Sequence, residues 1–197
     1  NPAAAAYYHD SKEKGFKTVF SAYAEASIIP EKLKFKTSYN LDFYFFDSRN
    51  YSPENYVGGS QGNATSALSK TYGYGTYHII DNTLTYSDTK GAHSFSAMLG
   101  QSTRMQYNAS LTGRANSVPG FDEQSKYLVN GSYKNQTTSD AASRYNGLSF
   151  FARGTYNYKD KYLATVTLRA DGSSKYQQKW GFFPSASVAW RMSKEPW

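Results

Sequence analysis

Cysteine is absent from this chain of 197 residues. Without thiols the protein forms neither a disulfide nor a thiolate metal site, and its redox compartment stays open. Long apolar runs are missing too, since no stretch approaches the roughly 18–20 apolar residues that a membrane helix requires. Leu, Ile and Val are sparse, so a conventional aliphatic core is not expected.

The apolar mass of the chain is aromatic instead. It holds 19 Tyr and 12 Phe, while apolar residues make up only 39% of the sequence and the mean hydropathy is −0.69. Aromatic rings with polar edges suit half-exposed surfaces and pack well on the pleats of a sheet. The composition therefore favours an all-β protein with one apolar face.

A formal net charge of +7 raises the question of nucleic-acid binding. The densest basic groups lie at 12–17 and 32–36, and acidic residues separate them. A nucleic-acid site needs a continuous basic patch or stripe. We therefore expect no nucleic-acid partner.

The two ends do not resemble finished termini. The chain opens "NPAAAAYYHDSKEKG", without the basic and apolar segments of a secretory signal, and it ends "SKEPW". We expect an internal piece of a longer polypeptide.

Alternation with a period of two dominates the sequence, and helical periodicity is essentially missing. In "LKFKTSYNLDFYFF", residues 33–46, most of the odd-numbered residues from Leu33 to Phe45 are apolar. The even-numbered residues include Lys34, Lys36 and Asp42. Successive side chains of a strand point to opposite faces, so this run predicts a strand with one apolar and one charged face. It would be about 45 Å long, against roughly 17–20 Å for a typical strand.

The same pattern predicts seven strands in all. They are expected at 18–29, 33–46, 74–87, 93–107, 146–158, 161–171 and 181–191. The first connections alternate between short (30–32, 88–92, 159–160) and long (47–73, 108–145), followed by an intermediate one at 172–180. Short turns at one end and long polar loops at the other are typical of bacterial outer-membrane barrels. A large soluble β-sandwich with an aromatic core is the alternative.

The C-terminal sequence carries a long motif. Within "DKYLATVTLRADGSSKYQQKWGFFPSASVAWRMSKEPW", residues 160–197, it comprises Leu168, Arg169, Asp171, Gly172, Ser173, Ser174, Lys175, Tyr176, Trp180, Gly181, Phe182, Phe183, Pro184, Ser185, Ser187, Ala189, Trp190 and Arg191. This segment closely resembles the signature of SusC/RagA-type TonB-dependent outer-membrane transporters. Weaker similarity extends over 22–43 and 82–102.

The resemblance implies a fold, a location and partners. The fold would be an antiparallel up-and-down transmembrane β-barrel, of which this chain supplies about seven strands out of 22. It would lie in the outer membrane of a Gram-negative bacterium, in contact with lipid, and the signal peptide and plug domain would lie outside residues 1–197. The implied function is import of oligosaccharides or peptides, driven by TonB–ExbB–ExbD and assisted by a SusD-like surface lipoprotein.

Enzyme and cofactor sites find no support in the sequence. "DGSSK", residues 171–175, lacks the spacing of a phosphate-binding loop or a calcium loop, and Asp-Gly after a strand is ordinary turn chemistry. His9, His78 and His93 stand apart with no metal-ligand spacing. We therefore expect no catalytic residue, no metal and no cofactor.

Two sets of residues are candidates for contacts. Arg153, Arg169 and Arg191 lie on the polar faces of three successive predicted strands, where they either balance carboxylates or contact the plug. Exposed tyrosines are candidates for stacking on a sugar or covering a lipoprotein: Tyr51, Tyr56, Tyr72, Tyr74, Tyr107 and Tyr127.

The alternative function from another class is a soluble β-rich glycan-binding module with Tyr-rich loops. The two hypotheses differ in where the apolar face of the strands lies. A closed two-sheet core containing Val166 and Val188 favours the module, and an outward apolar band favours the barrel.

Overall fold

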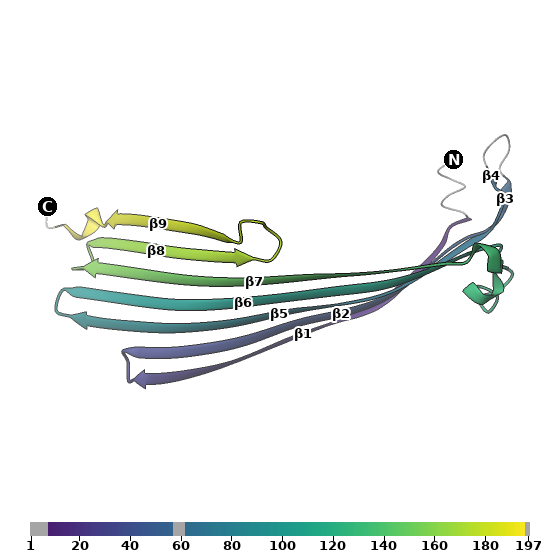
Figure 1. Cartoon of the computed structure of the whole chain (residues 1–197). Coiled ribbons are helices and arrows are strands. Elements are labelled where there is room, and N and C mark those ends of the chain that lie inside the picture. The colour runs from purple at the N-terminus through teal and green to yellow at the C-terminus, as the bar shows by residue number, and fades with distance from the viewer. Residues whose placement is uncertain (1–7, 57–61, 196–197) are drawn as a thin grey trace. The chain divides into compact units, whose positions relative to one another are not determined.

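The computed structural model describes residues 8–56 and 62–195. Seven long strands form one sheet in chain order (Figure 1). They are β1 (Asp10–Ile29), β2 (Leu33–Ser52), β5 (Ala67–Lys90), β6 (His93–Asn116), β7 (Thr137–Tyr158), β8 (Tyr162–Ser173) and β9 (Trp180–Trp190). The predicted antiparallel seven-stranded arrangement is confirmed, and within the described residues the sheet does not close into a barrel.

The remaining elements are small. β3 (Asn55–Tyr56) and β4 (Gly62–Asn63) pair as a two-stranded hairpin, and the 3-10 helices are η1 (Leu128–Asn130), η2 (Tyr133–Asn135) and η3 (Met192–Lys194). None of the helices in residues 8–56 and 62–195 has the length and apolar composition that a membrane crossing requires.

The described residues fall into two compact units. The first contains 8–18, 43–56, 62–76 and 107–143, and the second contains 19–42, 77–106 and 144–195. The tight turns between strands belong to the second unit. The loop at 117–136 belongs to the first.

The tight turns have the backbone geometry that short hairpins need. Lys159 and Asp160 have φ of 50° and 56°, and the Lys161 amide donates to the Tyr158 carbonyl over 3.0 Å. Two successive residues with positive φ match the right-handed twist of the flanking strands. At the first turn, Pro30 is followed by Glu31 with a φ of 62°, which is the pattern of a type II turn.

Strand register places the two faces as the alternation predicts. Arg153 lies opposite Thr167, and Thr167 lies opposite Ser185. On the other side, Ala164 lies opposite Val188. Because directly opposed residues of an antiparallel pair share a face, β7, β8 and β9 have one polar face and one apolar face. We use these two names for the faces of the second unit below.

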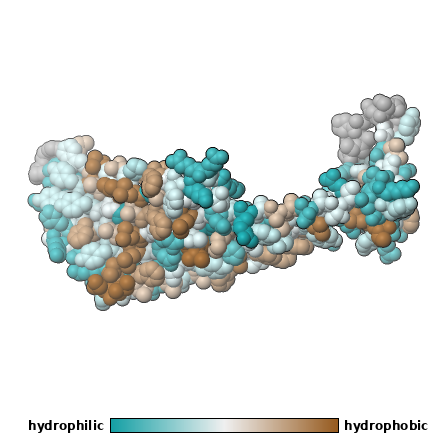
Figure 2. All heavy atoms as spheres, in the orientation of Figure 1, coloured by the Kyte–Doolittle hydropathy of each residue, from teal (hydrophilic) through white to brown (hydrophobic). Residues whose placement is uncertain are grey.

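The apolar face is exposed rather than buried in a core. Val166 is 51% exposed, Phe182 75% and Val188 87%. Figure 2 shows hydrophobic side chains gathered over the strands of the second unit. The described residues do not form the two-sheet core that a soluble module requires, because their strands make up one large sheet and one small hairpin.

The predicted loops at 47–73 and 108–145 are too long. β2 continues to Ser52, β5 begins at Ala67, β6 continues to Asn116 and β7 begins at Thr137. Polar side chains carry the pairing there: the hydroxyls of Thr71 and Thr112 lie 3.0 Å apart. Such pairs stabilise a sheet without apolar alternation, so a search for alternation ends these strands too early.

Candidate functional site

The polar face carries a charged pair near the end of β8. The Arg169 Nε lies 2.8 Å from each carboxylate oxygen of Asp171, and its terminal amino group lies 3.4 Å from the Ser149 hydroxyl. Arg169 and Asp171 are two residues apart on one strand and therefore share a face. The Arg169 guanidinium also lies 5.8 Å from the centre of the Phe151 ring. These contacts fix the guanidinium in one position.

The outer loop, residues 174–179, is pinned to β7. The Ser174 amide donates to the Asn146 carbonyl, and the Asn146 amide donates to the Ser174 hydroxyl, both over 2.9 Å. The Ser173 amide donates to the Lys179 carbonyl, which closes the loop at its base. The two serines of "DGSSK" therefore shape a connection between strands, as predicted. The loop occupies 174–179 rather than 172–180, because pairing with β7 extends β8 to Ser173.

A cavity of about 650 Å³ lies between the outer loop and the polar face. Its charged and aromatic lining comes from β6 to β9 and the loop: Arg104, Tyr145, Arg169, Asp171, Lys175, Tyr176, Lys179, Trp180 and Phe183. The volume falls in the range of small-ligand pockets. We call this the loop cavity.

A second cavity of about 420 Å³ shares two residues with the loop cavity. Arg104 and Arg169 line both, and the rest of the second cavity is formed by Lys36, Ser38, Asp81, Thr83, Ser102 and Phe151. Together the two cavities are lined by residues of the polar face from β2 to β9. We call this the sheet cavity.

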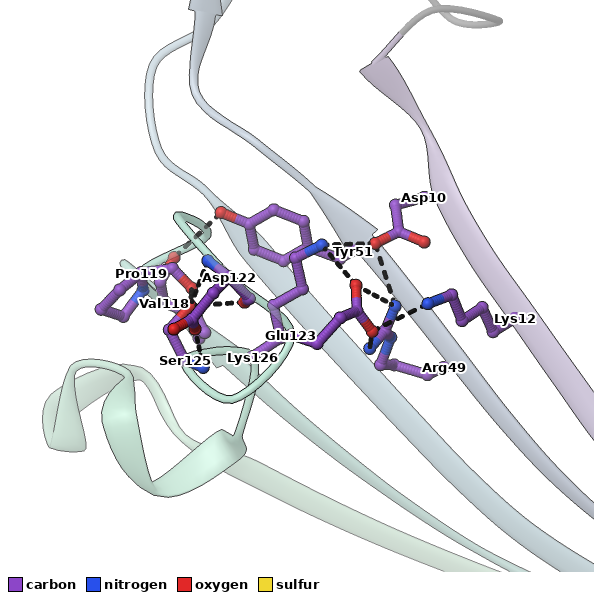
Figure 3. A network of polar contacts seen from close by, with 10 residues as sticks. All are labelled: Asp10, Lys12, Arg49, Tyr51, Val118, Pro119, Asp122, Glu123, Ser125 and Lys126. Atoms are coloured by element: carbon purple, nitrogen blue, oxygen red, sulfur yellow. Dashed lines mark hydrogen bonds and ion pairs between the residues drawn. The ribbon is translucent and has the colours of Figure 1, made fainter.

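The first unit contains a different cluster, built around the loop at 117–136 (Figure 3). Glu123 receives hydrogen bonds from Arg49 at 2.7 Å and from Lys12 at 2.8 Å, and Lys126 lies 3.1 Å away. Asp10 accepts from Lys126 at 2.6 Å and from Arg49 at 2.9 Å. The cluster ties the loop to β1 and β2.

Two shifted pKa values report this electrostatic environment. Hydrogen bonds from Arg49, then Lys12 and Lys126, hold the pKa of Glu123 far below its usual range. The hydrogen bond to Asp10 raises the pKa of Lys126, and burial opposes this effect. Both groups are therefore charged at neutral pH.

A small apolar cluster lies beneath the same loop. Leu68, Ala115 and Val118 are each 1% exposed, and Leu128 packs against them. The Tyr51 hydroxyl donates to the Val118 carbonyl over 3.1 Å. The loop is therefore a packed structure rather than a flexible tether.

The three candidate arginines have different surroundings. Arg169 is paired as described, and Arg153 is exposed and forms no ion pair within residues 8–56 and 62–195. Arg191 follows β9 and lies 2.8 Å from Asp160 at the tight turn. The pKa of Asp160 is lowered, first by a hydrogen bond from Asn157 and then by the positive charge of Arg191. The structure does not bring the three arginines into one cluster.

Four of the candidate tyrosines are strand residues, and for Tyr51 and Tyr72 this corrects the predicted loop at 47–73. Tyr51 is in β2, Tyr72 and Tyr74 are in β5, and Tyr107 is in β6. Tyr51 is only 5% exposed, so it is not available for stacking on a ligand. The reason is the same extension of the strands by polar pairing.

The other two tyrosines do lie outside the large sheet. Tyr56 is in β3 and is 79% exposed, and Tyr127 precedes η1 with the Lys70 ammonium 4.2 Å from its ring centre. Tyr74 and Tyr107 instead contact each other across neighbouring strands, with ring centres 5.9 Å apart and an interplanar angle of 49°.

The motif residues occupy one continuous region. Arg169, Asp171, Gly172 and Ser173 belong to β8, Ser174 to the outer loop, and the stretch from Trp180 to Trp190 forms β9. Trp180 and Phe183 line the loop cavity with Arg169 and Asp171. Sequence reasoning missed Arg104, which comes from β6, because only strand pairing brings it next to this motif.

The described residues contain no group of three or more His, Asp or Glu placed to hold a metal ion. The loop cavity offers charged and aromatic side chains to a ligand.

Comparisons with known proteins place the chain. No protein-family model matches it. A TonB-dependent receptor from Formosa agariphila is 30% identical over 199 residues, which cover 99% of this chain and 19% of the receptor. TonB-dependent receptor SusC from Bacteroides thetaiotaomicron is 30% identical over 113 residues, which cover 56% of this chain and 11% of SusC. The chain thus spans about a fifth of the length of the first of these relatives.

Solved structures agree on the fold. The RagAB peptide transporter superposes with a TM-score of 0.81 at 15% identity, over 93% of this chain and 20% of that chain. The RagAB peptide importer in its "open-open" state gives a TM-score of 0.80 at 16% identity, with the same coverage. The resemblance in residues 160–197 is confirmed: this chain corresponds to part of a TonB-dependent receptor of the SusC/RagA type, folded as a segment of its β-barrel.

Proposed function

We propose that this chain forms part of the wall of an outer-membrane importer for oligosaccharides or peptides. The observation that carries the proposal is the separation of the two faces. Val166, Phe182 and Val188 are exposed on the apolar face, while the opposite face carries the ion pair and the two cavities. In a bilayer the apolar face contacts lipid and the polar face lines the lumen.

The complete importer contains parts that lie outside this chain. A plug domain fills the lumen, TonB–ExbB–ExbD pulls on it, and a SusD-like lipoprotein covers the outer opening. A related protein is named SusC, and a similar fold occurs in a structure called a peptide transporter. Both names support an oligosaccharide or a peptide as the substrate class of the proposed importer.

Within that machine the present residues act by position and charge. Arg153 and Arg169 face the lumen and contact the plug, and Tyr56 and Tyr127 contact the lipoprotein or the arriving substrate. No residue of this chain performs a chemical step. Binding energy from the wall and the lid holds the substrate until the plug moves.

Uptake by cells tests the proposal. The gene that contains this chain is deleted, and uptake of fluorescent oligosaccharides and peptides is compared with that of the parent strain, with and without a protonophore. We expect one substrate class to lose energy-dependent uptake on deletion and to regain it on complementation. Equal uptake of both classes by parent and deletion strains contradicts the proposal.

A further inference from the structure

The two connected cavities on the polar face have an excess of positive charge. Their basic lining is Lys36, Arg104, Arg169, Lys175 and Lys179, and their carboxylates are Asp81 and Asp171. Five basic side chains against two carboxylates give a formal charge of +3. A concave surface lined mainly by one sign of charge attracts ligands of the opposite sign.

Three of the basic side chains are already engaged. Arg169 is paired with Asp171 at 2.8 Å. The Lys175 ammonium lies 5.2 Å from the centre of the Tyr145 ring, and the Lys36 ammonium lies 4.6 Å from the centre of the Tyr23 ring. Each therefore has a fixed place in the wall.

The side chains of Arg104 and Lys179 have no hydrogen-bonded acidic partner within residues 8–56 and 62–195, although the charge of Arg104 interacts with that of Asp171. Arg104 lines both cavities, and Lys179 lines the loop cavity at the base of the outer loop. A bound anion would accept hydrogen bonds from both cations.

Aromatic rings form the rest of the loop cavity. Phe183 lies opposite Arg169 on the polar face and is 57% exposed. Tyr176 is 69% exposed on the outer loop. Rigid rings with polar edges offer flat apolar contact to a ring-shaped ligand at small entropic cost.

We propose that the loop cavity binds an acidic oligosaccharide, with Arg104 and Lys179 binding its carboxylate or sulfate groups and Phe183 contacting a sugar ring. The proposal rests on the proposed import function, because it names the substrate class of that importer. Asp171 and Ser149 position Arg169 beside the ligand. A neutral sugar or an uncharged peptide would offer the two cations no anionic group to bind.

A charged thiol reagent probes the cavity directly. The chain has no cysteine, so Gln178→Cys in the receptor containing it, with any other cysteines replaced, puts one thiol in the lining of the loop cavity. We expect a sulfonate-bearing methanethiosulfonate to react about 5-fold faster than the trimethylammonium reagent, each rate being normalised to that with free cysteine. Arg104→Gln should lower this ratio about 3-fold. Lys159→Gln, which removes a cation at the tight turn between β7 and β8, should leave the ratio unchanged.

Protection experiments then identify the ligand. Purified receptor carrying Gln178→Cys is incubated with trigalacturonate, neutral galactotriose or triglutamate before labelling. We expect only trigalacturonate to slow labelling, and Arg104→Gln to abolish its protection. Equal protection by galactotriose, stronger protection by triglutamate, or no protection by any of the three overturns the proposal.

Two controls keep the result interpretable. Heat-modifiable gel mobility shows that each variant is folded, and calorimetric titration of Arg104→Gln without the new cysteine repeats the comparison. Because binding is measured on purified receptor, it is independent of energised uptake. Uptake of neutral sugars or peptides with no acid-selective binding would overturn this inference and leave the import function standing.

Discussion

The Nε atom of Arg169 lies 2.8 Å from both carboxylate oxygens of Asp171, two residues farther along β8. The pair belongs to the motif that identifies the family, and it lines the loop cavity. Its geometry shows what the acid of "DGSSK" does: it holds a guanidinium on the polar face. Ser174 then fastens the outer loop to β7, and Ser173 closes the loop at its base.

Replacing Asp171 by Asn tests this role of the carboxylate. The side chains are 38% and 37% exposed, so an ion pair of this kind contributes little to stability and the barrel should fold normally. The variant removes one negative charge from the cavity. We expect the preference for the sulfonate reagent at Gln178→Cys to rise about 2- to 4-fold. An unchanged preference would show that Asp171 does not influence the field in the cavity.

A glycine of β6 lies under an aromatic ring of β7. A Cβ atom added at Gly100 would come within 2.1 Å of the Phe151 ring, whereas at Gly154 it would meet nothing within 4 Å. Gly100→Ala should therefore displace Phe151 and lower the stability of the barrel by about 1 to 3 kcal/mol. The temperature at which the folded band disappears in a gel-mobility assay measures the loss. Gly154→Ala is the control, and equal shifts for the two variants would refute the packing argument.

The hydroxyl of Tyr51 contributes to the packing of the loop at 117–136. Tyr51→Phe removes its hydrogen bond to the Val118 carbonyl and should weaken the loop by about 1 kcal/mol or less. The loss is small because the Ser66 hydroxyl still donates to that carbonyl over 2.7 Å. Hydrogen exchange of residues 117–136 should quicken accordingly. Tyr56→Phe, at an exposed site, should leave the exchange of residues 117–136 unchanged. Faster exchange of these residues in Tyr56→Phe would argue that the Tyr51 hydrogen bond is not what stabilises the loop.

The ion cluster around Glu123 predicts that the stability of this loop depends on pH. Folding lowers the pKa of Glu123 below its ordinary value of 4.5. The stabilisation is therefore complete above pH 4.5 and is lost as the pH falls towards the folded pKa. Folding raises the pKa of Lys126 above 10.5, so its contribution is lost only at strongly alkaline pH.

Limited proteolysis measures this dependence. Cleavage within 117–136 should be constant between pH 5 and 9 and should accelerate below pH 4.5, after correction for the activity of the protease. The Glu123→Gln variant should be cleaved faster at neutral pH, and its cleavage rate should rise less as the pH falls. The same acid response in Glu123→Gln and the parent would mean that other carboxyls hold the loop.

The sequence predicted the second unit well because alternation is strong there. The apolar residues Val166 and Val188 are predicted on one face, and the polar residues Thr167 and Ser187 on the other. The strand register confirms this assignment of the two faces. The prediction was wrong in the first unit, where Tyr51 and Tyr72 are strand residues instead of residues of a loop at 47–73. Polar pairs such as Thr71 with Thr112 support those strands, and they carry no apolar period.

The candidate site was only half visible in the sequence. Arg169, Asp171 and Trp180 lie in one recognisable motif, but the loop cavity also needs Arg104 and Tyr145 from β6 and β7. Their place follows from pairing between segments far apart in the chain. No local pattern specifies that pairing, because each strand is compatible with several neighbours until the sheet forms.

The most direct test is the accessibility of the two faces in intact outer membranes. Single cysteines are placed at Val166 and Val188 on the apolar face, and at Thr167 and Ser187 on the polar face. They are labelled with a water-soluble maleimide and, separately, with a lipid-soluble one. The account predicts that Val166→Cys and Val188→Cys react only with the lipid-soluble reagent, and that Thr167→Cys and Ser187→Cys react with the water-soluble one. The reverse pattern, or equal labelling of all four sites by the water-soluble reagent, would contradict a barrel wall.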